Sequence, residues 1–235
     1  MAIRQITLCV VLMLSSSFVV CEEKDPDPWR KFNEKMHGFN ETLDKYILKP
    51  VAKGYKKITP EPLDKGITNF FSNLREPINF VNDLLQAKPG ESVIDLGRFT
   101  VNSTVGLLGF FDVATGLEWH RNREDFGQTL GKWGVPSGPY IVIPFLGPST
   151  VRDGLAKVPE SFTNLNPIVA ATDDTGVVVG STVINIIDSR ADLLELEKIL
   201  FGNRYVAMRD VYLQTREFDV TDGNVEDDFM SDDDW

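Results

Sequence analysis

The chain has 235 residues, of which 42% are hydrophobic, and a net charge of −11. This length allows one sizeable domain with its own core, and the apolar content excludes a chain that is disordered throughout. The acidity belongs to one end, since residues 219–235 hold eight acidic side chains and no basic one, which leaves −3 for the rest. Such a tail cannot bury enough apolar surface to fold and repels nucleic acid. We therefore expect residues 219–235 to be disordered and no nucleic acid to be bound.

Residues 1–21 have the pattern of an export signal. Arg4 precedes an apolar run over 6–20, and a run of this length is too short to span ~30 Å of hydrocarbon comfortably. Cys21 ends the segment and is either the lipid-bearing first residue of the mature protein or lies beside an ordinary cleavage site. Since Cys9 lies inside the signal, no intrachain disulfide is available to the mature chain. No later apolar run reaches spanning length, so we expect no membrane-crossing helix.

Apolar residues at helical spacing predict a series of amphipathic helices. The first stripe consists of Trp29, Phe32, Met36, Phe39 and Leu43. A lysine-rich stretch over 45–57 and a stiff corner at Pro60 and Pro62 follow. Further helical stripes cover 63–74, 75–86, 91–116, 176–201 and 205–218. Pro77 suits the start of its helix, where the missing N–H costs nothing.

The middle of the chain differs from both ends. Residues 122–154 contain six glycines and four prolines, which predicts irregular backbone with tight turns. Within this Gly/Pro block only "PYIVIPF", residues 139–145, has the composition of a short strand. The fold class is therefore mainly α, in a single domain with an irregular insert. The broad aromatic faces fit either an ordinary soluble core or helices lying in a membrane interface.

Several long motifs resemble the MlaA family, also called VacJ lipoproteins. They include "DPWRKFNEKMHGFNETLDKYILKPVAKGYKKITPEP", "DFGQTLGKWGVPSGPYIVIPFLGPSTVRD" and "YVAMRDVYLQTREF". The resemblance runs from Asp27 to about Phe218, which suggests a division into a signal (1–21), an MlaA-like domain (22–218) and a tail (219–235). It also makes Cys21 the candidate lipid anchor, although Val20 departs from the small residue that lipoprotein signals have before the cysteine.

The resemblance implies a ring of amphipathic helices in the periplasmic leaflet of the outer membrane, around a polar channel. Such a protein removes phospholipid misplaced in the outer leaflet and passes it to a periplasmic carrier of the MlaC type, and it associates with trimeric porins. No chemistry is done on the lipid, so neither enzymatic activity nor a cofactor is expected. The family motifs supply seven candidates for the lipid path: Asn40, Asp112, Gly131, Gly134, Gly138, Arg152 and Asp153.

Each candidate also has a structural interpretation. The polar ones are either channel or gate residues, or caps and buried hydrogen-bond partners that position helices. The three glycines provide hinge-like freedom or only permit positive φ in turns. The lysines over 45–57 either meet lipid phosphates or form a solvated helix face.

Two other functions are alternatives to transport. A periplasmic lipid hydrolase has little support, because the chain has only His37 and His120, no G-x-S-x-G elbow, and no Cys/His cluster for zinc. Ser149, in "GPST", is the candidate nucleophile for such a hydrolase. A porin-associated scaffold without transport of its own is the other alternative.

Overall fold

The computed structural model describes residues 25–162, 165–197 and 202–224. A continuous helical arc opens this part of the chain: α2 (Arg30–Leu43), the π-helical turn η1 (Asp44–Leu48) and α3 (Lys49–Ile58). α4 (Glu61–Asn73) and α5 (Glu76–Leu85) follow, each with a proline in its first turn. The expected corner at Pro60–Pro62 and the helix start at Pro77 are thus confirmed, since in the first turn of a helix the missing N–H of proline costs no hydrogen bond.

The predicted helix over 91–116 is broken. α6 (Pro89–Thr104) ends and the four-residue α7 (Val113–Gly116) begins after a turn. In this turn Leu107, Leu108 and Gly109 all have positive φ, at 53°, 61° and 91°. Left-handed backbone ends a helix. Two leucines gave no sequence signal for such a conformation, so the prediction of one continuous helix was wrong.

The Gly/Pro block is more regular than its composition predicts. It holds α8 (Phe126–Lys132), the antiparallel strands β1 (Tyr140–Ile143) and β2 (Gly147–Thr150), and the start of α9 (Val151–Phe162). The strand expected over 139–145 is confirmed. The expectation of irregular backbone holds for residues 122–125 and 133–139, and was wrong for the residues of α8, β2 and α9. α8 forms because the Asp125 side chain caps its start by accepting a hydrogen bond from the Gln128 N–H at 2.9 Å.

The last helices are α10 (Pro167–Ala171), α11 (Thr175–Leu196) and α12 (Arg204–Val220). α12 continues past the expected start of the tail, and the Asp222 carboxylate accepts hydrogen bonds from Lys88 and Lys132. The expectation of disorder was therefore wrong for residues 219–224. Residues 225–235, and the signal with Cys21, lie outside the described residues.

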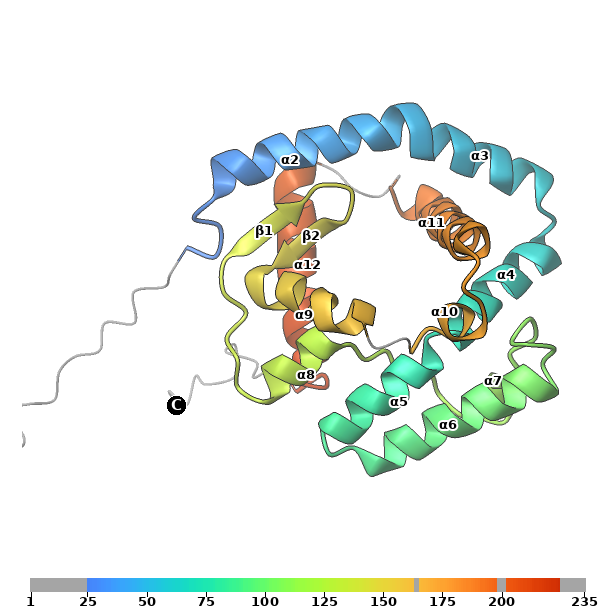
Figure 1. The fold of residues 1–235 in the computed structure, drawn as a ribbon. Helices are drawn as coiled ribbons and strands as arrows, with labels where there is room; N and C mark the ends of the chain where they lie inside the picture. The colour runs from blue at the N-terminus through green and yellow to red at the C-terminus, as the bar shows by residue number, and fades with distance from the viewer. Residues whose placement is uncertain (1–24, 163–164, 198–201, 225–235) are drawn as a thin grey trace, which may run out of the picture.

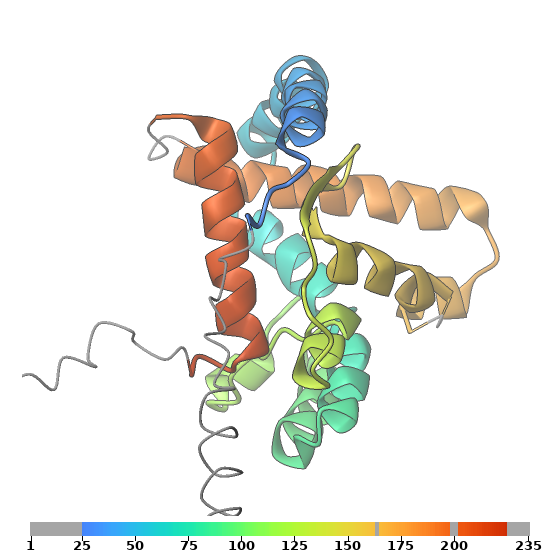
Figure 2. The ribbon, with the colours of Figure 1, turned by 90° about the vertical axis from the view of Figure 1, so that its left-hand side faces the viewer.

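The elements form a ring (Figure 1). α2 and α3 make one side, α4 to α6 continue round it, and α8 with the β1–β2 hairpin closes it against α2. Figure 2 shows α12 along one face of the ring and α11 crossing from that face to the other. In the described ranges no helix combines the length and apolarity needed to cross a bilayer.

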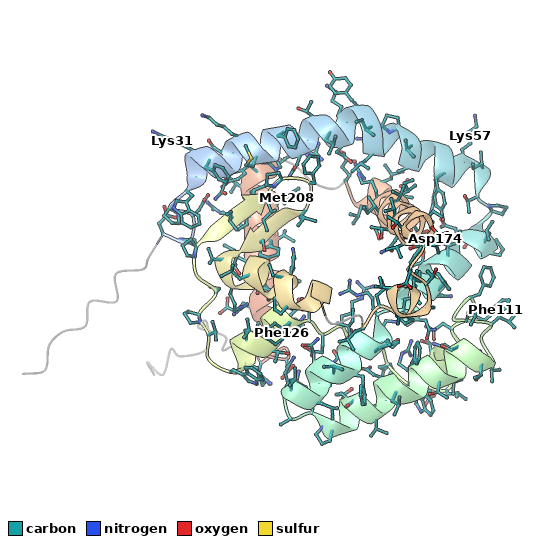
Figure 3. The ribbon with its side chains drawn as sticks, in the orientation of Figure 1. Lys31, Lys57, Phe111, Phe126, Asp174 and Met208 are labelled. Atoms are coloured by element: carbon teal, nitrogen blue, oxygen red, sulfur yellow. The ribbon has the colours of Figure 1, made fainter. Side chains whose placement is uncertain are left out.

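Burial in this ring is inverted relative to a soluble protein. Among the described residues only seven hydrophobic side chains are buried, against 22 polar or charged ones, while 32 large hydrophobic side chains are exposed. Buried polar groups normally form a minority, and exposed apolar area on this scale marks contact with a membrane or another protein. In Figure 3, Lys31, Lys57 and Phe111 lie on the outer edge of the ring.

Candidate functional site

Asp112 is the centre of a buried ionic cluster. Its side chain caps α7 by accepting from the Thr115 N–H at 3.2 Å, and it also accepts from Asn102 at 3.0 Å. The Arg98 guanidinium donates to its two oxygens at 3.1 and 3.2 Å, and Arg121 donates at 3.1 Å. Burial alone would raise the pKa of Asp112, but the hydrogen bonds from Thr115 and Asn102 and the charge of Arg98 hold it below its usual value.

Arg98 extends this cluster to the neighbouring helix. Its Nε donates to Glu76 Oε1 on α5 at 3.0 Å, and both side chains are 0% exposed. A further Arg98 N–H donates to the carbonyl of Trp119 in the loop after α7. The cluster therefore ties α5, α6, α7 and that loop together through charge-assisted hydrogen bonds.

Arg152 and Asp153 belong to a second cluster, which joins α8, α9 and α12. Asp153 accepts from Arg216 at 2.9 Å and from the Tyr212 hydroxyl at 2.8 Å, and Arg152 donates to it at 2.9 Å. Arg216 also holds both oxygens of Asp125, at 2.7 and 2.6 Å. The residue that caps α8 is thus fixed to α12 by a bidentate pair.

Asn40 anchors the tip of the β1–β2 hairpin to α2. Its amide donates to the Ile143 carbonyl at 3.1 Å, and its oxygen accepts from the Phe145 N–H at 2.9 Å. Phe145 has a positive φ of 65°, and its ring meets that of Phe39 edge-on with centroids 5.3 Å apart. The amide therefore supports a turn that a non-glycine residue adopts at a cost.

Each of the three candidate glycines has a local structural reason, backbone conformation for two of them and side-chain packing for the third. Gly134 and Gly138 have φ values of 87° and 67°, which side chains rarely adopt. Gly131 lies in a tight contact, since a Cβ there would lie 2.7 Å from Arg152 Nη1 and 2.8 Å from Val220 Cγ1.

The candidates therefore do not form one site. Gly131, Arg152 and Asp153 come together, whereas Asn40 and Asp112 lie in separate clusters. Their contacts fit the second interpretation, that of caps and hydrogen-bond partners. A role in the lipid path stays a prediction.

The sequence analysis did not identify the buried polar stripes of two neighbouring helices. On α5 and α6 the buried residues are the polar stripes Glu76, Asn79, Asn82 and Asp83, and Ser92, Asp95, Arg98 and Asn102. Their helical spacing was the available signal. Burial raises the pKa of Asp83 to about 6, and burial followed by the hydrogen bond to Asp83 raises that of Asp95 to about 9. The Asp83 carboxyl on α5 is therefore close enough to Asp95 on α6 to disfavour the charged form of Asp95.

No arrangement for hydrolysis is visible in the part of the chain that the structure describes. The Ser149 hydroxyl donates to the Thr150 carbonyl, while His37 lies 3.7 Å from Glu41 and edge-on to the Tyr205 ring. His120 lines a cavity of about 670 Å³ whose described lining contains no serine, threonine or cysteine. Over the same ranges, no group of His, Cys, Asp or Glu side chains could hold a metal ion.

Comparison with known proteins assigns the chain to a family. The family model described as MlaA lipoprotein matches residues 25–219. The chain belongs to the MlaA lipoprotein family. It is 34% identical to "Intermembrane phospholipid transport system lipoprotein MlaA" of Escherichia coli over 205 residues, which is 85% of this chain and 80% of that relative. The protein of the same name from Haemophilus influenzae is 32% identical and covers 85% of this chain and 81% of its own length.

Two further matches are an uncharacterized protein and a solved structure. "Uncharacterized protein RT0044" of Rickettsia typhi is 36% identical, covering 83% of this chain and 78% of its own. A chain from work on the "Structural basis for maintenance of bacterial outer membrane lipid asymmetry" superposes with a TM-score of 0.72 at 34% identity, covering 83% of this chain and 98% of that one. The resemblance read from the sequence motifs and the mainly helical, single-domain fold are both confirmed.

Proposed function

We propose that this chain carries out intermembrane phospholipid transport: it removes misplaced phospholipid from the outer leaflet of the outer membrane, which maintains lipid asymmetry. The observation that carries the proposal is the inverted ring, with charged and amide side chains buried and 32 large hydrophobic ones exposed among the described residues. Its relatives bear the name of a phospholipid transport system lipoprotein.

The movement of phospholipid explains why polar side chains are buried and apolar ones exposed. A phospholipid crossing a bilayer unaided must bring its charged head group through hydrocarbon, and burying one unpaired charge costs on the order of ten kcal/mol or more. A ring with an apolar outside and a polar inside lets the head group travel in a polar path while the acyl chains stay in hydrocarbon. Such a path needs no nucleophile and no cofactor.

The proposed position is the periplasmic leaflet. Apolar side chains are exposed on elements around the ring, from Phe32 on α2 to Phe218 on α12. No described helix is long and apolar enough to span both leaflets. A ring set into one leaflet buries these side chains in lipid. It hands phospholipid to a periplasmic carrier of the MlaC type and sits beside a trimeric porin, which contacts part of the outer edge.

Within the ring we assign the Gly/Pro block to the lipid path or the periplasmic surface. Irregular backbone is tolerated at membrane depth only beside protein or water, and the turns at Gly134 and Gly138 are such backbone. The polar candidates hold the elements that border the path in place; these candidates are Asn40, Asp112, Arg152 and Asp153. Single cysteines at 131–138 in a Cys21→Ala background should react with a water-soluble maleimide. Uniform protection, together with reaction with a lipid-phase probe, would place the block against hydrocarbon.

A transfer assay tests the function. The full chain is reconstituted with its porin in vesicles that carry labelled phospholipid, and label appearing on an added periplasmic carrier is followed with and without the chain. Transfer that depends on the chain supports the proposal. Porin binding without transfer would instead indicate a scaffold, and chain-dependent release of free fatty acid would indicate a hydrolase.

A further inference from the structure

A groove on one side of α3 concentrates positive charge. It is a cavity of about 570 Å³ between α3 and the end of α11, lined by Lys49, Lys53, Lys56, Lys57, Leu194, Glu195 and Glu197. Lys49, Lys53 and Lys56 lie one helical turn apart, so they share one side of the helix. We call this cavity the lysine groove.

Two lysines of the groove are already neutralised. Lys49 Nζ lies 2.8 Å from Glu197 Oε1, and Lys56 Nζ lies 2.7 Å from Asp64 Oδ2. Lys53 and Lys57 are exposed and have no ion pair within the described ranges. The groove therefore has two ammonium groups available to an anion, positioned beside two that are held in place by carboxylates.

The other faces of α3 show what surrounds this charge. Ala52 is buried, and the Tyr55 hydroxyl donates to Asp188 on α11 at 2.7 Å, so this face packs on the ring. Val51 and Ile58 are 46% and 80% exposed, and helical periodicity puts them on the side of α3 away from the lysines. A helix with lysines on one side and bare aliphatic side chains on the other has the pattern of a helix lying at the boundary between head groups and acyl chains.

We infer that the lysine groove binds the phosphate of a net-anionic phospholipid resident in the leaflet. Lysine ammonium groups bind phosphate through charge-assisted hydrogen bonds, and basic residues beside a membrane surface attract anionic lipid. A zwitterionic head group brings its own ammonium, which competes with Lys53 and Lys57 for the phosphate. The inference rests on the proposed position in one leaflet, and it adds a lipid-binding site that fixes the depth and tilt of the ring.

The test uses the full chain in neutral detergent micelles. It measures the binding of lipid and the protection of the groove lysines from an amine reagent. Short-chain phosphatidylglycerol is titrated by calorimetry, and the reactivity of each lysine toward an amine reagent is mapped by mass spectrometry. Phosphatidylcholine of the same chain length and inorganic phosphate are the comparison ligands. The variant is Lys53→Gln with Lys57→Gln. The matched control is Lys31→Gln with Lys35→Gln, which removes the same charge from exposed positions on α2.

We expect phosphatidylglycerol to protect Lys53 and Lys57 and its binding to weaken on the order of tenfold in the groove variant, with the control variant unchanged. Equal weakening in both variants, or no protection, would overturn the inference. Equal protection by inorganic phosphate at the same concentration would overturn the assignment to lipid. The transfer assay separates the two proposals: protection of the groove in a chain that transfers no lipid contradicts only the proposed function, while transfer without protection contradicts only the groove.

Discussion

Replacing Arg98 by methionine should destabilise the ring severely. The substitution keeps most of the side-chain volume but removes the nearer of the two guanidinium charges beside Glu76. The Glu76 carboxylate is 0% exposed and lies 3.0 Å from Arg98 Nε and 3.6 Å from Arg121 Nε. Removing one partner of a buried ion pair leaves an uncompensated buried charge and costs about 3–5 kcal/mol. For a chain of this size that corresponds to a fall in melting temperature on the order of 10 °C.

The assay is thermal unfolding in neutral detergent, followed by far-ultraviolet circular dichroism. The matched control is Arg30→Met, because Arg30 pairs with Glu34 on the surface at 2.9 Å, where both side chains are about half exposed. Exposed pairs contribute little, so its melting temperature should not change. Adding Glu76→Gln to Arg98→Met should recover part of the loss, since no charge is then left unpaired there. If Arg98→Met melts no lower than Arg30→Met, the cluster does not hold the helices as argued.

Three further predictions concern the carboxyl pair, the anchor and the Gly/Pro block. Because the pKa values of Asp83 and Asp95 lie near 6 and 9, above those of the unfolded chain, the native state binds more protons between about pH 4 and 9. The free energy of unfolding should fall with rising pH across that window, and Asp95→Asn should flatten the slope; an unchanged slope would contradict the raised pKa of Asp95. Cys21→Ala should leave much of the chain in the membrane fraction after cell fractionation, because the exposed apolar faces bury more area than an acyl chain does; folded protein found wholly in the soluble fraction would refute this. Gly131→Ala should lower the melting temperature, since its Cβ would lie 2.7 Å from Arg152 Nη1, whereas Gly38→Ala meets nothing within 4 Å and should be neutral or stabilising.

Much of the helical fold could be predicted because helix formation shows in local spacing. The apolar stripe from Trp29 to Leu43 predicted α2, and Pro77 predicted the start of α5. The break after α6 could not be predicted in this way, since Leu107 and Leu108 adopt positive φ only within the folded chain. The order at Asp222 likewise depends on Lys88 and Lys132, which are distant in sequence.

The candidate site was harder to predict for a different reason. Motif resemblance selects positions, and Asp112 and Asp153 are indeed centres of polar clusters. Their partners Arg98 and Arg216 were not singled out from the sequence, because an arginine on a helix usually lies on the solvated face. Which contacts they make depends on how α5, α6, α8, α9 and α12 assemble.

Spacing also leaves open which face of a helix is turned inward. On α6, Val93 and Leu96 are 69% and 50% exposed, while Asp95 and Arg98 are buried. In water this orientation would expose apolar area and bury charge at the same time, so it would be unfavourable twice over. In a lipid leaflet the apolar face needs no protein partner, and the only groups that must find partners are polar. The interior of the ring is therefore held by ion pairs and amide hydrogen bonds.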